Sequence, residues 1–92
     1  MRGTIGELIA AADMMARRFT VFAPLSRSAA ACDLIGISRD GRHVVRVEVR
    51  TGKRRSGRLI YSRHGVPEKR DHLAIVVEGG PVEYIPPLPD VR

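Results

Sequence analysis

A tight turn between two β-prone runs is the sequence feature that most constrains the fold. Residues 32–38 and 42–51 are rich in Val, Ile and Leu, and Asp40-Gly41 lies between them. An Asp-Gly pair is a strong signal for a two-residue type I′ hairpin, because both turn positions need positive φ angles. With this dipeptide as the whole loop, the numbers of facing residues sum to 81. The sequence therefore predicts a hairpin with a defined register.

This register pairs two acidic residues. Asp33 and Glu48 have numbers that sum to 81, so we expect them to face each other with Cβ atoms about 4.5–5.5 Å apart. Two opposed carboxylates repel, which calls for a positive partner. Either a bound cation bridges them, or Arg46 and Arg50 on the same strand face neutralise them. Carboxylate oxygens suit Mg²⁺ better than Zn²⁺, and a one-residue bulge would separate the pair.

The rest of the chain predicts one helix and further strands. Thr4 and Glu7 have the spacing of a capping box, and apolar residues then recur at helical spacing, which predicts a helix over 5–18 that buries Ile5, Leu8, Ile9, Ala12, Met15, Ala16 and Phe19. A short β-prone stretch follows at 20–22. The continuous apolar run 73–77 predicts a strand covered on both faces, and 82–85 is a last strand before a proline-rich tail. The order predicts an α+β fold, an N-terminal helix on a mixed sheet of four to five strands, in a single domain over 1–92.

The positive charge is concentrated in one segment. The chain carries a formal charge of +6, and residues 50–70 hold eight bases and one acid, whereas the rest of the chain holds eight bases and nine acids. The segment also contains three glycines, which predicts a mobile basic loop. Such a charge suits a nucleic-acid backbone better than a membrane surface, although a merely solvated loop remains the alternative. The candidate contact residues are Lys53, Arg54, Arg55, Arg58 and Arg63, with Arg27 in the loop before Asp33.

Composition excludes several classes of protein. An apolar content of 43% argues against a disordered chain, and no stretch approaches the roughly 18 consecutive apolar residues of a membrane span. The N-terminus lacks the pattern of a secretory signal, and Cys32 is the single cysteine, which excludes an intramolecular disulfide. We expect a cytoplasmic protein. Because a chain this short has a thin core, self-association is also expected.

Several ordered segments resemble the PD-(D/E)XK nuclease superfamily, in particular its group I intron homing endonucleases and Holliday-junction resolvases. The matching segments cover most of the chain outside the basic segment: Gly6-Glu7, Ala10 to Met15, Val21 to Pro24, Asp33-Leu34-Ile35, Val47 to Thr51, 71–77 and 82–86. The resemblance implies a restriction-endonuclease-like core and a DNA endonuclease that depends on Mg²⁺ or Mn²⁺.

The same resemblance assigns roles to individual residues. Asp33 matches the motif aspartate and Glu48 the second carboxylate, so both would hold the metal, and Glu7 matches a first-helix glutamate that adds to the metal shell. Arg50 stands at the motif lysine, where arginine retains the positive charge but cannot act as a base. The catalytic set implied is Asp33, Glu48, Arg50 and Glu7. A homodimer or larger homo-oligomer would cut two strands, and a nuclease fold that binds DNA without cutting it is the alternative.

Overall fold

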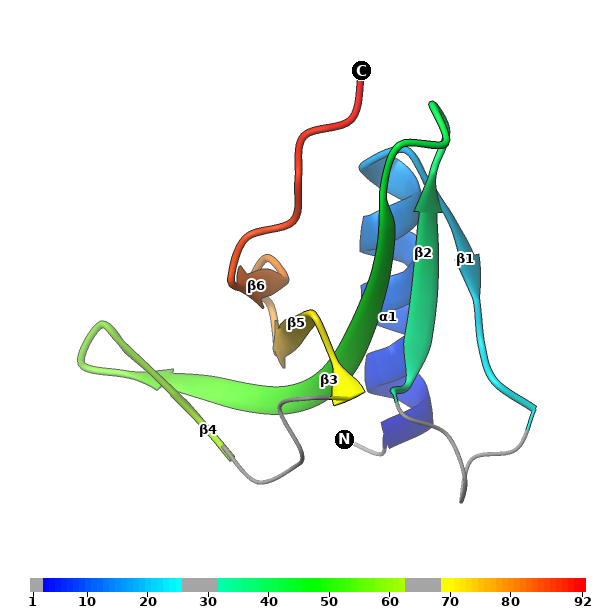
Figure 1. The fold of residues 1–92 in the computed structure, drawn as a ribbon. Helices are drawn as coiled ribbons and strands as arrows, with labels where there is room; N and C mark the ends of the chain where they lie inside the picture. Colours follow the sequence, from blue (N-terminus) through cyan, green and yellow to red (C-terminus); the bar gives the residue numbers. More distant parts are fainter. Residues whose placement is uncertain (1–2, 26–31, 63–68) are drawn as a thin grey trace.

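The computed structural model describes residues 3–25, 32–62 and 69–92. One helix precedes six strands (Figure 1). The elements are α1 (Gly3–Ala16), β1 (Phe19–Phe22), β2 (Leu34–Ser38), β3 (Val44–Arg55), β4 (Arg58–Tyr61), β5 (His72–Val77) and β6 (Glu83–Ile85).

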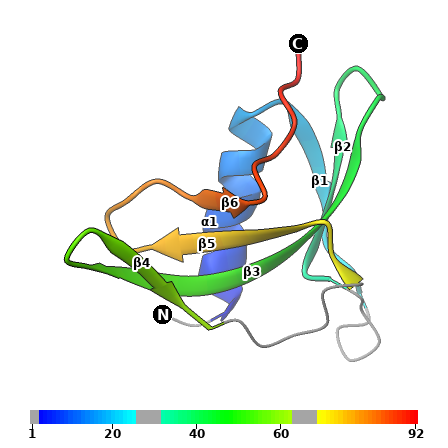
Figure 2. The ribbon, with the colours of Figure 1, turned by 60° about the vertical axis from the view of Figure 1, so that its left-hand side comes forward.

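The strands form one mixed sheet in the order β1-β2-β3-β5-β6, and β4 pairs with β3 off this path. The β3–β5 pair is parallel, and the other pairs are antiparallel. Helix α1 lies against one face of the sheet, and β4 crosses near the far end of β3 (Figure 2). The predicted α+β fold is confirmed. The sheet has one strand more than the upper expectation, because β4 arises within the basic segment.

The predicted hairpin register is confirmed, although its turn differs. β2 and β3 pair from Ile37↔Val44 to Leu34↔Val47, and these numbers sum to 81 as predicted. The Gly41 amide donates to the Ser38 carbonyl at 2.9 Å, and Gly41, with φ of 75°, is the described turn residue in the left-handed region. The loop therefore spans residues 39–42 rather than a type I′ dipeptide. It is longer by one residue on each side, which leaves the register unchanged.

The basic segment is not a mobile loop where it is described. Residues 50–55 continue β3, and 58–61 form β4. Ser56 (φ 52°) and Gly57 (φ 76°) join them with positive φ at both loop positions, which is the backbone of a type I′ turn. The Ser-Gly dipeptide followed by the β-prone run 59–61 was the sequence signal for this hairpin. It was missed because the segment was interpreted from its basic residues and glycines.

Helix α1 buries a different face from the predicted one. Ala10 and Met14 are fully buried against the sheet, whereas Leu8 and Met15 remain 66% and 58% exposed. The close approach of helix and sheet explains the choice, since a Cβ added at Gly36 would lie 2.6 Å from Cε of Met14. Four residues of the predicted face thus form an exposed apolar stripe on α1, made of Ile5, Leu8, Ile9 and Met15, whereas Phe19 of the same set is buried at the start of β1. The helix begins at Gly3, so Thr4 lies in its first turn and the predicted capping box is not confirmed.

The end of α1 provides a stability prediction. Arg18 has φ of 73°, a conformation that costs a residue with a Cβ about 1–2 kcal/mol. We expect Arg18→Gly to raise the free energy of unfolding by about 0.5–1 kcal/mol, measured by urea denaturation. The control is Arg17→Gly, which removes the Arg17–Asp13 ion pair of 2.8 Å and should destabilise. An Arg18→Gly variant less stable than wild type would contradict the expectation.

Candidate functional site

One edge of β3 lacks a strand partner along part of its length. At Val47, β3 pairs with β2 on one side and β5 on the other, and at Gly52 it pairs with β4 and β5. β2 and β4 therefore pair with the same edge of β3, at different positions along it. In the described part of the chain, no strand pairs with this edge between them, at residues 48–51, which we call the 48–51 edge. Backbone groups there are available to side chains.

Asp33 occupies the 48–51 edge. Its amide donates to the Val47 carbonyl at 3.1 Å, which breaks the register of the ladder, and its Oδ2 accepts the Val49 amide at 2.8 Å. The expectation that Asp33 faces Glu48 as a paired residue is therefore wrong. The chain bends at Asp33. The Asp33 carboxylate accepts the Val49 amide, which a backbone carbonyl of a neighbouring strand would accept in a continuous sheet.

The three predicted acids are electrostatic neighbours. Burial raises the pKa of the Asp33 carboxyl above its ordinary value, and the nearby carboxylates of Glu7 and Glu48 raise it further. The Val49 amide and Arg50 act in the opposite direction. A carboxylate made less acidic by burial and by two other acids is typical of functional sites. The structure thus brings Glu7 on α1 and Glu48 on β3 close enough to act on Asp33.

This environment predicts that Asp33→Asn stabilises the fold. The folded protein holds the Asp33 proton more tightly than the unfolded chain, so stability falls as the pH rises from the ordinary pKa of 3.8 through the raised value, and the loss persists at neutral pH. We expect a higher Tm for Asp33→Asn than for wild type at pH 7, with the difference vanishing near pH 3, where wild-type Asp33 is also neutral.

Asp71→Asn is the matched control with the opposite sign. The Arg46 guanidinium lowers the pKa of Asp71, so the charged form contributes stability above the ordinary pKa that is lost as the pH falls. Asp71→Asn should therefore lower Tm at pH 7. Equal effects of the two substitutions would contradict the assignment of Asp33 to a destabilising environment.

Glu48 is held by two arginines. Its Oε2 accepts from Arg50 at 2.5 Å, and its Oε1 accepts from Arg70. The side chains of Glu48 and Arg70 are only 18% and 13% exposed. Arg50 is thus one of the two arginine partners that the sequence predicted for the acids, and Arg70 rather than Arg46 is the other. Arg50 itself is where the sequence predicted it, beside the acidic pair.

Arg46 instead forms a clamp with Asp71. Its guanidinium donates to both carboxylate oxygens, at 3.2 and 3.0 Å, and its amide donates to Oδ2 at 2.8 Å. The Asp71 amide returns a bond to the Arg46 carbonyl at 2.8 Å. This clamp joins β3 to the start of β5 and directs Arg70 toward Glu48. Sequence reasoning missed Arg70 and Asp71, because only the parallel β3–β5 pairing places them here.

The carboxylate oxygens at this site suit a hard divalent cation. In this structure, however, they already accept hydrogen bonds from the Val49 amide, Arg50 and Arg70. Asp33 and Glu48 offer carboxylate oxygens, the ligands of Mg²⁺ and Mn²⁺, and the mutual repulsion that raises the pKa of Asp33 favours a cation. Across residues 3–25, 32–62 and 69–92, no three His, Cys, Asp or Glu side chains form a ready metal cluster. An ion that binds to Glu48 competes for these oxygens with the guanidinium groups that now hold them.

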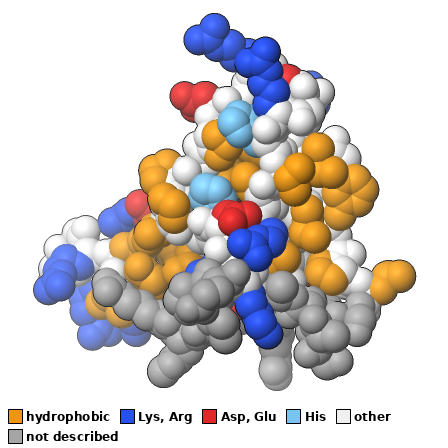
Figure 3. Space-filling model, in the orientation of Figure 1, with side chains coloured by type: hydrophobic (Ala, Val, Ile, Leu, Met, Phe, Trp, Pro, Cys, Tyr) orange, Lys and Arg blue, Asp and Glu red, His pale blue; other side chains and the backbone are white. Residues whose placement is uncertain are grey.

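The second charged feature is the hairpin arm, residues 52–61, which projects from the body of the sheet (Figure 1). Lys and Arg side chains gather over it (Figure 3), and the predicted contact residues Lys53, Arg54, Arg55 and Arg58 are all exposed there. Arg54 also pairs with Glu83 of β6, which supports the arm. The other two predicted contacts, Arg27 and Arg63, lie outside the described residues.

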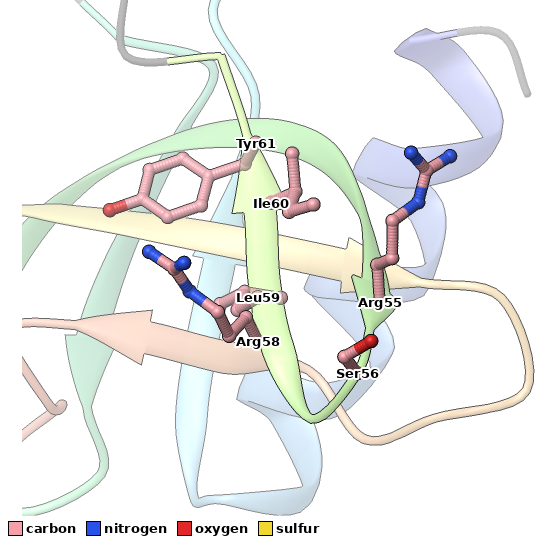
Figure 4. A pocket seen from close by; sticks show the side chains of 6 residues that line it. All are labelled: Arg55, Ser56, Arg58, Leu59, Ile60 and Tyr61. Atoms are coloured by element: carbon pink, nitrogen blue, oxygen red, sulfur yellow. The ribbon is translucent and has the colours of Figure 1, made fainter.

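The tip of the arm holds like charges together. Arg55 and Arg58 are Cα partners across β3 and β4, an arrangement that is destabilising without an anion. They border a shallow hollow of about 500 Å³ with Tyr61. Figure 4 shows the Arg58 guanidinium and the Tyr61 ring on one side of β4 and the Arg55 side chain on the other. The tip therefore presents positive charge on both sides of β4, where a polyanion can be bound.

Comparison with known proteins identifies a structural neighbour. No protein-family model matches the chain, and no curated protein does. Among solved structures, a bacterial homing endonuclease, I-Ssp6803I, matches with a TM-score of 0.60 at 17% identity. The match covers 83% of this chain and 60% of that chain, so the described fold corresponds to part of the larger protein. The chain has a nuclease-like fold. In the described residues, no helix is long and apolar enough to span a membrane.

Proposed function

We propose that this protein is a divalent-metal-dependent DNA endonuclease of the PD-(D/E)XK type. In this proposal Asp33 and Glu48 hold Mg²⁺ or Mn²⁺, and Glu7 completes the shell from α1. A metal bound there supplies Lewis-acid polarisation of the scissile phosphate and a more acidic water. Two observations support the assignment: these acids act on one another at the 48–51 edge, and the chain shares the fold of a homing endonuclease.

The remaining roles fall to cationic side chains. Arg50, beside Glu48 at 2.5 Å, stabilises charge on the phosphate by parallel hydrogen bonds but removes no proton. The hairpin arm binds the DNA backbone through Lys53, Arg54, Arg55 and Arg58, and Arg27 and Arg63 complete the interface. Binding through these groups is dominated by counterion release and depends strongly on salt.

The direct test is cleavage. Purified protein is incubated with supercoiled plasmid and with branched DNA, in Mg²⁺, in Mn²⁺ and in excess chelator. The proposal expects nicked or linear products with either ion and none with chelator. Products that form equally in chelator would exclude a metal-dependent reaction.

A second candidate is a nuclease-fold protein that binds DNA without cutting it. The observation that favours it is the double arginine pairing of Glu48, together with arginine at position 50. This candidate expects salt-dependent binding that chelator leaves unchanged. The variant Arg50→Lys discriminates between the active and the binding-only candidate. If arginine at position 50 is what prevents cleavage, the wild type does not cut DNA and Arg50→Lys does.

The endonuclease proposal includes self-association as a homodimer or larger homo-oligomer. One site of this kind cuts one strand, so cutting a duplex requires two copies. The exposed apolar stripe on α1 supports this, since large apolar surfaces left in water commonly mark interfaces. Sedimentation equilibrium of the purified chain measures the oligomeric state.

A further inference from the structure

The side chain of Arg70 is less exposed than those of Glu48 and Arg50, to which it is linked at the site. Its side chain is 13% exposed and bonds to Oε1 of Glu48, while Arg50 holds Oε2. Its backbone is set by the neighbouring Asp71–Arg46 clamp, whose amide-to-carbonyl bond measures 2.8 Å. Arg70 is therefore placed by the strand pairing of β3 and β5, and its guanidinium covers the Glu48 oxygen that Arg50 leaves.

A divalent ion on Glu48 changes the balance of charge. Two guanidinium groups, Arg50 and Arg70, balance the formal charge of the carboxylates Asp33 and Glu48, and Glu7 adds one further negative charge nearby. An ion adds two positive charges, which repel Arg70 and compete with it for the same oxygen. A displaced and poorly solvated guanidinium then needs another anion. A DNA phosphate at the site is an anion of the geometry that arginine binds best.

We propose that Arg70 is a displaceable counterion of Glu48, which passes from Glu48 to a DNA phosphate when the metal ion binds. The inference rests on the proposed function, since it assigns Arg70 a part at the same metal site. It makes metal and DNA binding mutually favourable. When the metal binds without DNA, Arg70 loses its ion pair with Glu48 and gains no other partner. When DNA is bound as well, a phosphate is available to pair with Arg70. Arg70 is thus a positioning residue that discourages the ion until substrate is present.

The first experiment measures Mn²⁺ binding without DNA, by the loss of the free-ion electron paramagnetic resonance signal. Removing the competing charge in Arg70→Gln should tighten Mn²⁺ binding at least about fivefold, a typical lower bound for coupled sites. Arg70→Lys keeps the charge and should stay near wild type. Lys69→Gln removes the same charge from an exposed neighbour and should change the affinity by less than about twofold. Far-UV circular dichroism confirms that each variant is folded.

The second experiment measures binding of a labelled duplex by fluorescence anisotropy, with and without Ca²⁺ as a non-cleaving ion. In wild type, Ca²⁺ should tighten DNA binding at least about fivefold, because it releases Arg70 to the phosphate. In Arg70→Gln this enhancement should fall to about twofold or less. An enhancement of equal size in both proteins would overturn the transfer of Arg70.

The outcomes separate the inference from the function on which it rests. If wild type and Arg70→Gln bind Mn²⁺ with equal affinity, the metal site stands and the role of Arg70 is wrong. If neither protein binds Mn²⁺ with or without DNA, the metal site itself is wrong and the inference falls with it. If Arg70→Gln binds Mn²⁺ more weakly than wild type, Arg70 supports the site rather than competing for it, and the inference is overturned.

Discussion

Asp33→Asn should lower the rate of metal-dependent cleavage by at least about 100-fold, a loss typical of removing one group that stabilises transition-state charge. The substitution is nearly isosteric, and the amide oxygen can still accept the Val49 amide that now bonds to Oδ2 at 2.8 Å. The bend of the chain is thus preserved while one negative ligand is lost. Cleavage of supercoiled plasmid in Mg²⁺ measures the rate, and duplex affinity in chelator should remain within about twofold of wild type.

Asp40→Asn is the matched control for this prediction. Asp40 accepts hydrogen bonds from Ser38 Oγ at 2.6 Å and the Arg42 amide at 3.0 Å, which an asparagine oxygen can also accept. It lies at the turn of the β2–β3 hairpin, at the opposite end of β2 from Asp33. Its cleavage rate should equal that of wild type. Wild-type cleavage by Asp33→Asn would contradict the assignment of Asp33 as a metal ligand.

The double substitution Arg55→Gln with Arg58→Gln should weaken duplex binding by about 10- to 100-fold near 0.1 M salt. The two arginines are Cα partners at the tip of the hairpin arm, and their side chains lie on opposite sides of β4 (Figure 4), so together they present positive charge to the phosphates of a duplex. If each contacts one phosphate, the slope of log affinity against log salt should become shallower by about 2. Fluorescence anisotropy at several salt concentrations measures both quantities. The loss should be similar for unrelated duplexes, because backbone contacts carry no sequence information.

Arg39→Gln with Arg42→Gln is the control for the hairpin arm. These two exposed arginines lie at the turn of the other hairpin, so the change in net charge is the same. Their removal should weaken binding by less than about threefold. An equal loss in the two double variants would show that net charge alone attracts DNA and would contradict a localised interface.

Features governed by local residues were predicted well from the sequence. The apolar alternation around Asp40-Gly41 determined the register of β2 and β3, because a slip would move every apolar side chain to the other face. The run 73–77 was predicted as a strand covered on both faces because it is continuously apolar, and residues 72–76 are all buried. The hairpin also brought Glu48 near Asp33, although not as its paired residue, whereas Glu7 was assigned only through the resemblance to the nuclease superfamily.

Features governed by distant partners were missed. The choice of the buried face of α1 depends on what the sheet offers, and the glycine at position 36 admits Met14 rather than the bulkier stripe. Arg70 reaches Glu48 only because β5 runs parallel to β3, a pairing between segments far apart in the chain. The bend at Asp33 depends on the Val49 amide having no strand partner there. None of these leaves a periodic or compositional signal in the sequence.

At the proposed metal site, Glu48 exchanges a guanidinium for a metal ion that it shares with Asp33. The most direct measurement is a crystal structure of the protein with a short duplex and Mn²⁺, located by its anomalous scattering. We expect an anomalous peak within bonding distance of carboxylate oxygens of both Asp33 and Glu48, with the Arg70 guanidinium moved from Oε1 of Glu48 to a phosphate. The proposed metal site would be contradicted if DNA is bound, no anomalous peak lies at Asp33 and Glu48, and Glu48 is still paired with Arg50 and Arg70.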